Sequence, residues 1–134
     1  MVNPKELRIG NYLNRRGNYL KVESISKEIV RMSDRGYDSD YPILLDDQIT
    51  GIELTDEILK RFTLPYLHSE WGELILKKTK HFSGKGAEAL DAYYLVNKED
   101  TGYIGRRIEY LHHLQNFVFD LSGEEIKGTF LKTV

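Results

Sequence analysis

The sequence predicts a single α+β domain, residues 1–134, in which short strands outnumber helices. Three observations carry this prediction. The first half alternates apolar and polar residues over short runs separated by Gly, Asp and Ser, as half-buried strands do. Residues 110–121 place apolar side chains at helical spacing. The length of 134 residues suits one domain, and nine Tyr and five Phe supply aromatic groups that a disordered chain lacks.

The N-terminal part, residues 1–54, is expected to form a small SH3-like or curled β unit. Its clearest run, residues 19–25, alternates so that Leu20 and Val22 share one face. Residues 15–18 precede this run and contain the Gly and Asn that a tight turn requires. The remaining elements of the unit are a second run at 28–32, a polar loop at 33–40 and strand candidates at 42–45 and 49–54.

A short helix is expected over residues 55–64. Thr55 can cap its start, and Asp56 and Glu57 then occupy the first turn, where the helix dipole favours negative charge. Pro65 ends the helix.

The second part, residues 65–134, is predicted to contain strands that pack under a helix at 110–121. The helix is expected to bury an apolar stripe that Leu111 borders, formed by Tyr110, Leu114, Phe117, Val118 and Leu121. Gly123 suits its C-terminal cap. The other expected elements are strands at 71–78, 92–96 and 103–109, a basic Gly-containing loop at 80–88 and an edge strand within 126–134.

Composition narrows the function classes. The net charge of −2 argues against a general polyanion binder, although the charges are unevenly distributed. Residues 1–31 are mainly basic and residues 34–57 mainly acidic. The absence of Cys excludes thiol catalysis and Cys-based metal sites. No apolar run is long enough for a membrane helix or a signal peptide, so we expect a cytoplasmic protein without a membrane partner.

Two segments carry a resemblance to known sequences. The first is LRIGNYL, Leu7 to Leu13, and the second runs from Glu109 to Ile126. The chain resembles a group of small proteins from Bacteroidetes genomes and their phages or mobile elements. The second segment matches that group at His112, Leu114, Gln115, Asn116, Leu121, Gly123, Glu124 and Glu125. The resemblance implies an accessory protein of mobile-element or phage type and transfers no activity.

The predicted C-terminal helix carries the most distinctive polar cluster. His112, Gln115 and Asn116 form one face, and their side chains either satisfy nearby loop backbone or form a recognition pocket. A neighbouring stripe of Glu109, His113, Asn116 and Asp120 could offer metal ligands. Zinc sites usually need a third protein ligand, and no second motif supplies one, so a solvated polar face is the favoured interpretation of that stripe.

Two basic segments could contact phosphates. They comprise Arg15 and Arg16 at the predicted turn, and Lys77, Lys78 and Lys80 further along the chain. Tyr side chains could supply stacking surfaces. The alternative interpretation is that these side chains only make the turns and strands soluble.

We expect a non-enzymatic protein-interaction module, because no catalytic, phosphate-binding or cofactor-binding motif is present. The partner would be a protein, with self-association left open. A nucleic-acid-binding accessory protein is the alternative. A metal-dependent enzyme using His112 or His113 with Glu109 or Asp120 is the third hypothesis. No catalytic residue, metal ligand or cofactor is assigned from the sequence.

Overall fold

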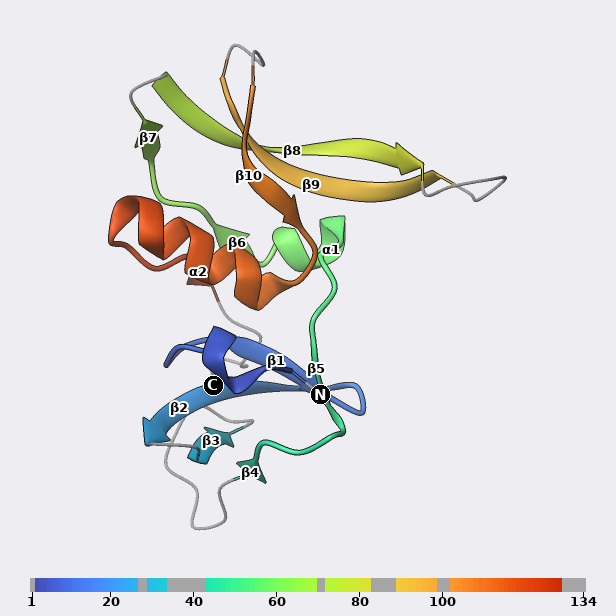
Figure 1. Ribbon diagram of the computed structural model, residues 1–134, viewed down its shortest axis with the longest axis vertical. Coiled ribbons are helices and arrows are strands. Elements are labelled where there is room, and N and C mark those ends of the chain that lie inside the picture. The colour runs from blue at the N-terminus through green and yellow to red at the C-terminus, as the bar shows by residue number, and fades with distance from the viewer. Residues whose placement is uncertain are drawn as a thin grey trace.

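Two antiparallel sheets lie on either side of one long helix, α2 (Leu111–Ser122) (Figure 1). The structure is a computed structural model and describes residues 2–26, 29–33, 43–69, 72–82, 89–98 and 102–128. Strands form most of the regular structure, so the predicted α+β class is confirmed. Among the described residues, no helix is long and apolar enough to cross a membrane.

The first sheet contains five strands in the order β4-β3-β2-β1-β5, with every neighbouring pair antiparallel. This sheet is the curled β unit that the sequence predicts. Its strands are β1 (Tyr12–Arg15), β2 (Asn18–Ser26), β3 (Ile29–Ser33), β4 (Ile43–Leu44) and β5 (Ile49–Gly51). The predicted loop at 33–40 lies almost entirely outside the described residues.

A two-residue turn joins β1 to β2 and fixes their register. Arg16 and Gly17 have φ angles of 53° and 87°, and two positive φ values match the right-handed twist of the flanking strands. The Asn14 side chain accepts a hydrogen bond from the Gly17 N–H at 2.9 Å. The tight turn predicted at residues 15–18 is therefore confirmed.

One face of the first sheet builds its own core. The buried side chains are Leu13, Leu20, Val22, Val30, Met32 and Ile49. Val2 and Leu7 cover them from the N-terminal segment, which also forms a 3₁₀ turn, η1 (Pro4–Glu6). The N-terminal segment is thus fixed onto the sheet by apolar burial, the main favourable term in folding.

The second sheet has four strands in the order β10-β9-β8-β7, also antiparallel. They are β7 (Leu67–Ser69), β8 (Gly72–Phe82), β9 (Ala89–Asn97) and β10 (Tyr103–Ile108). A separate pair joins β6 (Phe62–Thr63) to β11 (Lys127–Gly128). β11 confirms the start of the predicted C-terminal strand, and residues 129–134 lie outside the described part.

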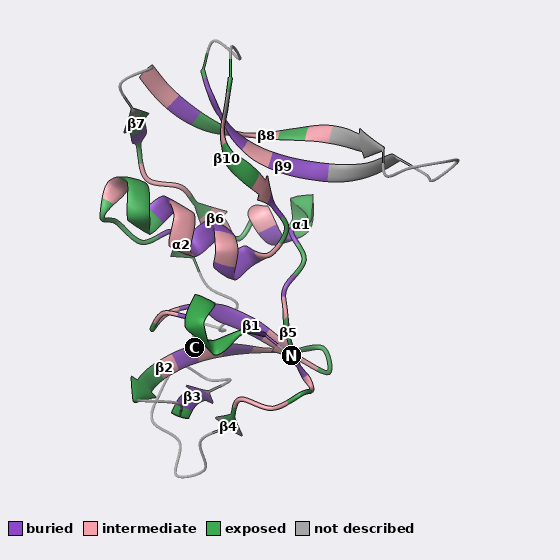
Figure 2. Ribbon diagram, in the orientation of Figure 1, coloured by how far each residue is buried: buried purple, intermediate pink, exposed green. Residues whose placement is uncertain are grey.

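Helix α2 packs against both layers and fills the space between them (Figures 1 and 2). Leu111, Leu114 and Val118 are buried in a core with the apolar face of the second sheet and with Tyr12 of β1. Gly123 ends the helix with a φ angle of 72°, as its predicted capping role requires.

The buried surface of α2 differs from the predicted stripe. Leu121 is 40% exposed, whereas His112 and Gln115 are only 1% and 3% exposed. The difference arises because the helix contacts β1 as well as the second sheet, so a second side of it is covered. That second side carries His112 and Gln115, which a helix with a single apolar face would expose to solvent.

Several predicted boundaries are wrong: the strand expected at 92–96 begins at Ala89, and the one expected at 49–54 ends at Gly51. Helix α1 (Asp56–Leu59) begins as expected, with Thr55 Oγ1 accepting from the Ile58 N–H at 3.2 Å. It ends well before residue 64 because Phe62–Thr63 pair with β11, a partner distant in sequence. Strand β8 extends to Phe82, so the predicted loop at 80–88 starts too early. Residues 83–88 lie outside the described part.

Candidate functional site

The Gln115 side chain joins α2 to the chain entering β1. Its Oε1 accepts the Tyr12 N–H at 2.9 Å, and its Nε2 donates to the Gly10 carbonyl at 2.9 Å. One buried amide therefore satisfies both a backbone donor and a backbone acceptor, as buried polar groups require. The structure places Gln115 in the backbone-satisfying role that the sequence offered as one of two interpretations.

Asn116 holds the preceding turn in the same way. Its Nδ2 donates to the Glu6 carbonyl at 2.6 Å, and its Oδ1 accepts from Asn11 Nδ2 at 2.9 Å. The buried Asn11 Oδ1 in turn accepts the Arg8 N–H at 2.8 Å. These hydrogen bonds hold residues 6–11 against α2.

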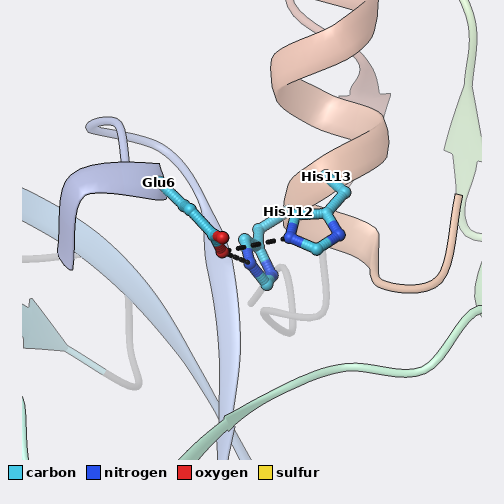
Figure 3. Close-up of side chains that lie close together, drawn as sticks. All are labelled: Glu6, His112 and His113. Carbon is cyan, nitrogen blue, oxygen red and sulfur yellow. Dashed lines mark hydrogen bonds and ion pairs between the residues drawn. The ribbon is translucent and has the colours of Figure 1, made fainter. Parts of the chain in front are cut away.

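This fastening brings the Glu6 carboxylate to the start of α2, where two adjacent histidines lie (Figure 3). Glu6 Oε2 is 3.1 Å from His113 Nε2 and 3.6 Å from His112 Nε2. The three side chains bring one donor atom each to within 4.8 Å of one another. The start of α2 is itself fixed, because Leu111 donates its N–H to the Ile52 carbonyl at 2.8 Å.

The two imidazoles have different environments. His112 is buried, and within the described residues neither of its ring nitrogens has a hydrogen-bond partner. Burial lowers the pKa of His112 to about 4, and the neighbouring His113 acts in the same direction while Glu6 partly opposes it. His113 is partly exposed and contacts the Glu6 carboxylate. The hydrogen bond from His113 lowers the pKa of Glu6. At neutral pH the cluster therefore combines an anionic carboxylate with a neutral buried imidazole.

Tyr110 and Gly51 complete the wall around His112. The Tyr110 ring stacks on the His112 ring with centroids 5.8 Å apart. Gly51 of β5 leaves room for both rings, because a Cβ at that position would lie 2.6 Å from the Tyr110 ring and 3.0 Å from His112 Cε1. A cavity of about 340 Å³ opens here, lined by Val2, Asn3, Glu6, Thr50, Gly51, Tyr110, His112 and His113.

A larger groove of about 830 Å³ runs along the other side of Glu6 and His113. The N-terminal turn, β10 and α2 form its walls, with Lys5, Arg106, Arg107, Asn116, Phe117 and Asp120 among the lining residues. β10 is irregular here. Ile104 and Ile108 pair with Leu95 and Tyr93 of β9, and the three residues between them have no paired residue on β9. Gly105, at a φ of 76°, makes this possible, since a Cβ there would lie 2.5 Å from the Phe117 ring.

The predicted basic segments do not meet. Arg15 and Arg16 belong to the first sheet and its hairpin, whereas Lys77, Lys78 and Lys80 belong to β8 of the second sheet (Figure 1). Arg15 contacts Asp46 at 3.3 Å, and Lys78 contacts Asp56 at 2.8 Å. Both carboxylates come from the acidic stretch at 34–57, so oppositely charged stretches pair within the molecule. The Lys80 side chain lies outside the described part.

Glu6 is the site residue that sequence reasoning missed. It replaces Glu109 and Asp120 as the carboxylate that both histidines face. Glu6 lies 107 residues from His113, in a turn with no periodic pattern. The only sequence signal was the Asn, Pro and acidic residue at the start of the chain, which are typical of a short helical turn.

Comparison with known proteins identifies no family for the chain: no protein-family model, curated protein sequence or solved structure matches it.

Proposed function

We propose that the protein is a non-enzymatic interaction module that binds an extended acidic segment of a partner protein in the groove between β10 and α2. The observation that carries this proposal is the 830 Å³ groove beside an interrupted edge strand. A groove of this size can hold several residues of an extended chain.

The backbone of β10 supports this mode of binding. In the described part of the chain, β10 is the last strand of its sheet and pairs with β9 on one side. Residues 105–107 leave the ladder and line the groove. A bulge interrupts regular strand pairing, but the backbone groups that it takes out of the ladder can hydrogen bond an extended peptide that lies in the groove.

Charged groups of both signs line the groove, since Glu6, Glu109 and Asp120 lie along it as well as cations. Arg106 and Arg107 are the groups that would contact an acidic partner. Arg106 is exposed, and Arg107 is half-buried with an Nε that has no partner among the described residues. Lys5 adds a third cation along the same groove. Arg side chains bind carboxylates through paired, charge-assisted hydrogen bonds, so an Asp or Glu on the partner would fit here. Phe117 offers an apolar contact beside them.

A site-specific crosslinking experiment tests the proposal. A photoreactive amino acid at position 120, an exposed position of α2 that lines the groove, should crosslink to a partner through an acidic segment. The same group at position 31, on the exposed face of β3, should not. A synthetic peptide of the crosslinked segment should then bind the purified protein. Replacing Arg106 and Arg107 with Glu should raise the Kd of that peptide about tenfold or more, because the introduced carboxylates repel those of the peptide.

Other outcomes would contradict this assignment. Equal crosslinking from positions 31 and 120 would exclude the groove as the binding site. A crosslinked species of twice the chain's mass would identify a second copy as the occupant, which size-exclusion chromatography with light scattering would confirm. Binding of oligonucleotides at low salt would instead favour the nucleic-acid alternative, which depends on Arg15, Arg16, Lys77, Lys78 and Lys80.

Further expectations from the sequence belong to this proposal. The resemblance implies a mobile-element or phage accessory protein, and the strand pattern implies an SH3-like N-terminal unit. A cytoplasmic location agrees with the absence of Cys from the sequence.

A further inference from the structure

We propose that Glu6, His112 and His113 form a binding site for a first-row divalent cation of the zinc type. This site lies beside the groove and does not depend on what the groove binds. It consists of one carboxylate from η1 and two imidazoles from the first turn of α2 (Figure 3).

The distances fit a coordination site. Donor atoms that bind a tetrahedral zinc ion at about 2.0–2.1 Å lie about 3.3 Å apart. Glu6 Oε2 lies 3.1 Å from one imidazole nitrogen and 3.6 Å from the other. All three donors lie within 4.8 Å of one another, so closing the two nitrogens around an ion needs only a modest rotation of the partly exposed His113 ring.

His112 gives a second and independent reason to expect a ligand. Its side chain is 2% exposed, yet within the described residues Nδ1 has no hydrogen-bond partner, and Nε2 has only the Glu6 carboxylate at 3.6 Å, beyond hydrogen-bond distance. A buried polar group without a partner costs about 1–3 kcal/mol, and native proteins usually avoid that cost. A cation bound by Nε2 would satisfy that nitrogen.

The surroundings leave space for the ion and for water. The cavity of about 340 Å³ includes all three side chains in its wall. A water molecule in the liquid takes about 30 Å³, so water can fill the remaining coordination positions. Three protein ligands with an open position resemble the ligand number of catalytic rather than structural zinc sites.

The donor set predicts which metals bind. Imidazole nitrogen favours Zn²⁺, Ni²⁺, Co²⁺ and Cu²⁺, whereas Mg²⁺ and Ca²⁺ prefer sites built from oxygen ligands. Bound metal would join the N-terminal turn to α2 by a bond stronger than the existing contact between Glu6 and His113. It would thereby fix the wall that the groove and the smaller cavity share, because Glu6 and His113 line both.

Metal titration of the full chain without a histidine tag tests the site. After treatment with EDTA and dialysis, calorimetry should show one Zn²⁺ per chain. Zinc at about a hundred times its Kd should raise the Tm by roughly 5–10 °C, and Mg²⁺ or Ca²⁺ should not. Cobalt should give the visible absorption band of a bound ion with nitrogen and oxygen ligands.

Variants assign the ligands. Glu6→Gln and His113→Ala change partly exposed side chains, so both should fold, and each should raise the Kd for zinc about tenfold or more. The matched controls are Glu57→Gln on α1 and His68→Ala on β7, which remove the same groups from exposed positions. The controls should change the Kd less than twofold.

Two results would overturn the proposal. The first is the absence of stoichiometric Zn²⁺ binding by the wild-type chain. The second is zinc binding that survives both Glu6→Gln and His113→Ala, since the ion would then be held elsewhere. Either result leaves the groove proposal standing, because that proposal depends on peptide binding by Arg106 and Arg107.

Discussion

Gln115 on α2 hydrogen bonds directly to the backbone of Tyr12, with 2.9 Å between Oε1 and the Tyr12 nitrogen. The same side chain donates to the Gly10 carbonyl. This relationship attaches the helix to the first sheet and fixes where the N-terminal turn lies. It acts together with the Asn116 side chain, whose hydrogen bonds hold Glu6 close to the two histidines.

The first prediction concerns Gln115 itself. Gln115→Ala should lower the free energy of unfolding by about 2–4 kcal/mol, because it leaves the buried Tyr12 N–H and the partly buried Gly10 carbonyl unpaired and creates a small cavity. Urea denaturation measures the change. Asp120→Ala, an exposed position on the same helix, should change stability by no more than about 0.5 kcal/mol. Similar losses for both variants would contradict the role given to Gln115.

The second prediction concerns Asn116, which bonds the Glu6 carbonyl and the Asn11 side chain. Asn116→Ala should loosen residues 6–11 more than it destabilises the whole protein, since both bonds lie at the edge of the fold. Hydrogen exchange followed by mass spectrometry should show faster exchange in the N-terminal peptide and unchanged exchange in β8 and β9. Uniformly faster exchange would mean that Asn116 supports the global fold instead.

The third prediction is a loss of stability in acid, measured without metal. Burial lowers the pKa of His112 from 6.5 to about 4, so the unfolded chain takes up a proton at higher pH than the folded chain does. The neutral His112 ring therefore contributes to the free energy of unfolding in full above pH 6.5, and this contribution is lost as the pH falls from 6.5 to 4. The difference between the two pKa values corresponds to about 3 kcal/mol. Three titratable groups lie around the ring: Glu6, His113 and Tyr110.

His112→Leu provides the comparison for this pH dependence. It fills the site without a titratable ring, so its stability should fall less between pH 7 and pH 4 than that of the wild type. Glu6, whose pKa is lowered from 4.5 mainly by the hydrogen bond from His113, contributes stability that is lost only as the pH falls below 4.5, and Glu6 and His113 remain in both proteins. If the free energy of unfolding fell equally with pH in the two proteins, His112 would be excluded as the cause of the loss in acid.

The fourth prediction concerns Gly105. Gly105→Ala should destabilise the protein by about 1–3 kcal/mol, because its φ of 76° disfavours other residues and its new Cβ would lie 2.5 Å from the Phe117 ring. Gly102→Ala, with no atom within 4 Å of the added Cβ, should change the Tm by far less. A matching loss in both variants would indicate that the bulge in β10 does not require glycine.

Local sequence patterns were sufficient for much of the fold. The alternation of Leu20 and Val22 predicted β2, and Gly17 predicted its turn, because strand faces and tight turns depend on neighbouring residues. Thr55 predicted the start of α1 for the same reason. The end of α1 depended on β11, and the buried polar side of α2 depended on β1. Neither contact leaves a signal in the adjacent sequence.

The sequence by itself determined the α+β class, the alternating strand β2 with the turn before it, the start of α1, and the polar character of His112, Gln115 and Asn116. Only the tertiary structure decided what those side chains face. The carboxylate beside the histidines comes from Glu6, 107 residues away from His113, and not from Glu109 or Asp120 on the same helix. Spacing along one helix reports which residues share its surface, whereas a ligand from another segment is fixed by packing and hydrogen bonds between segments.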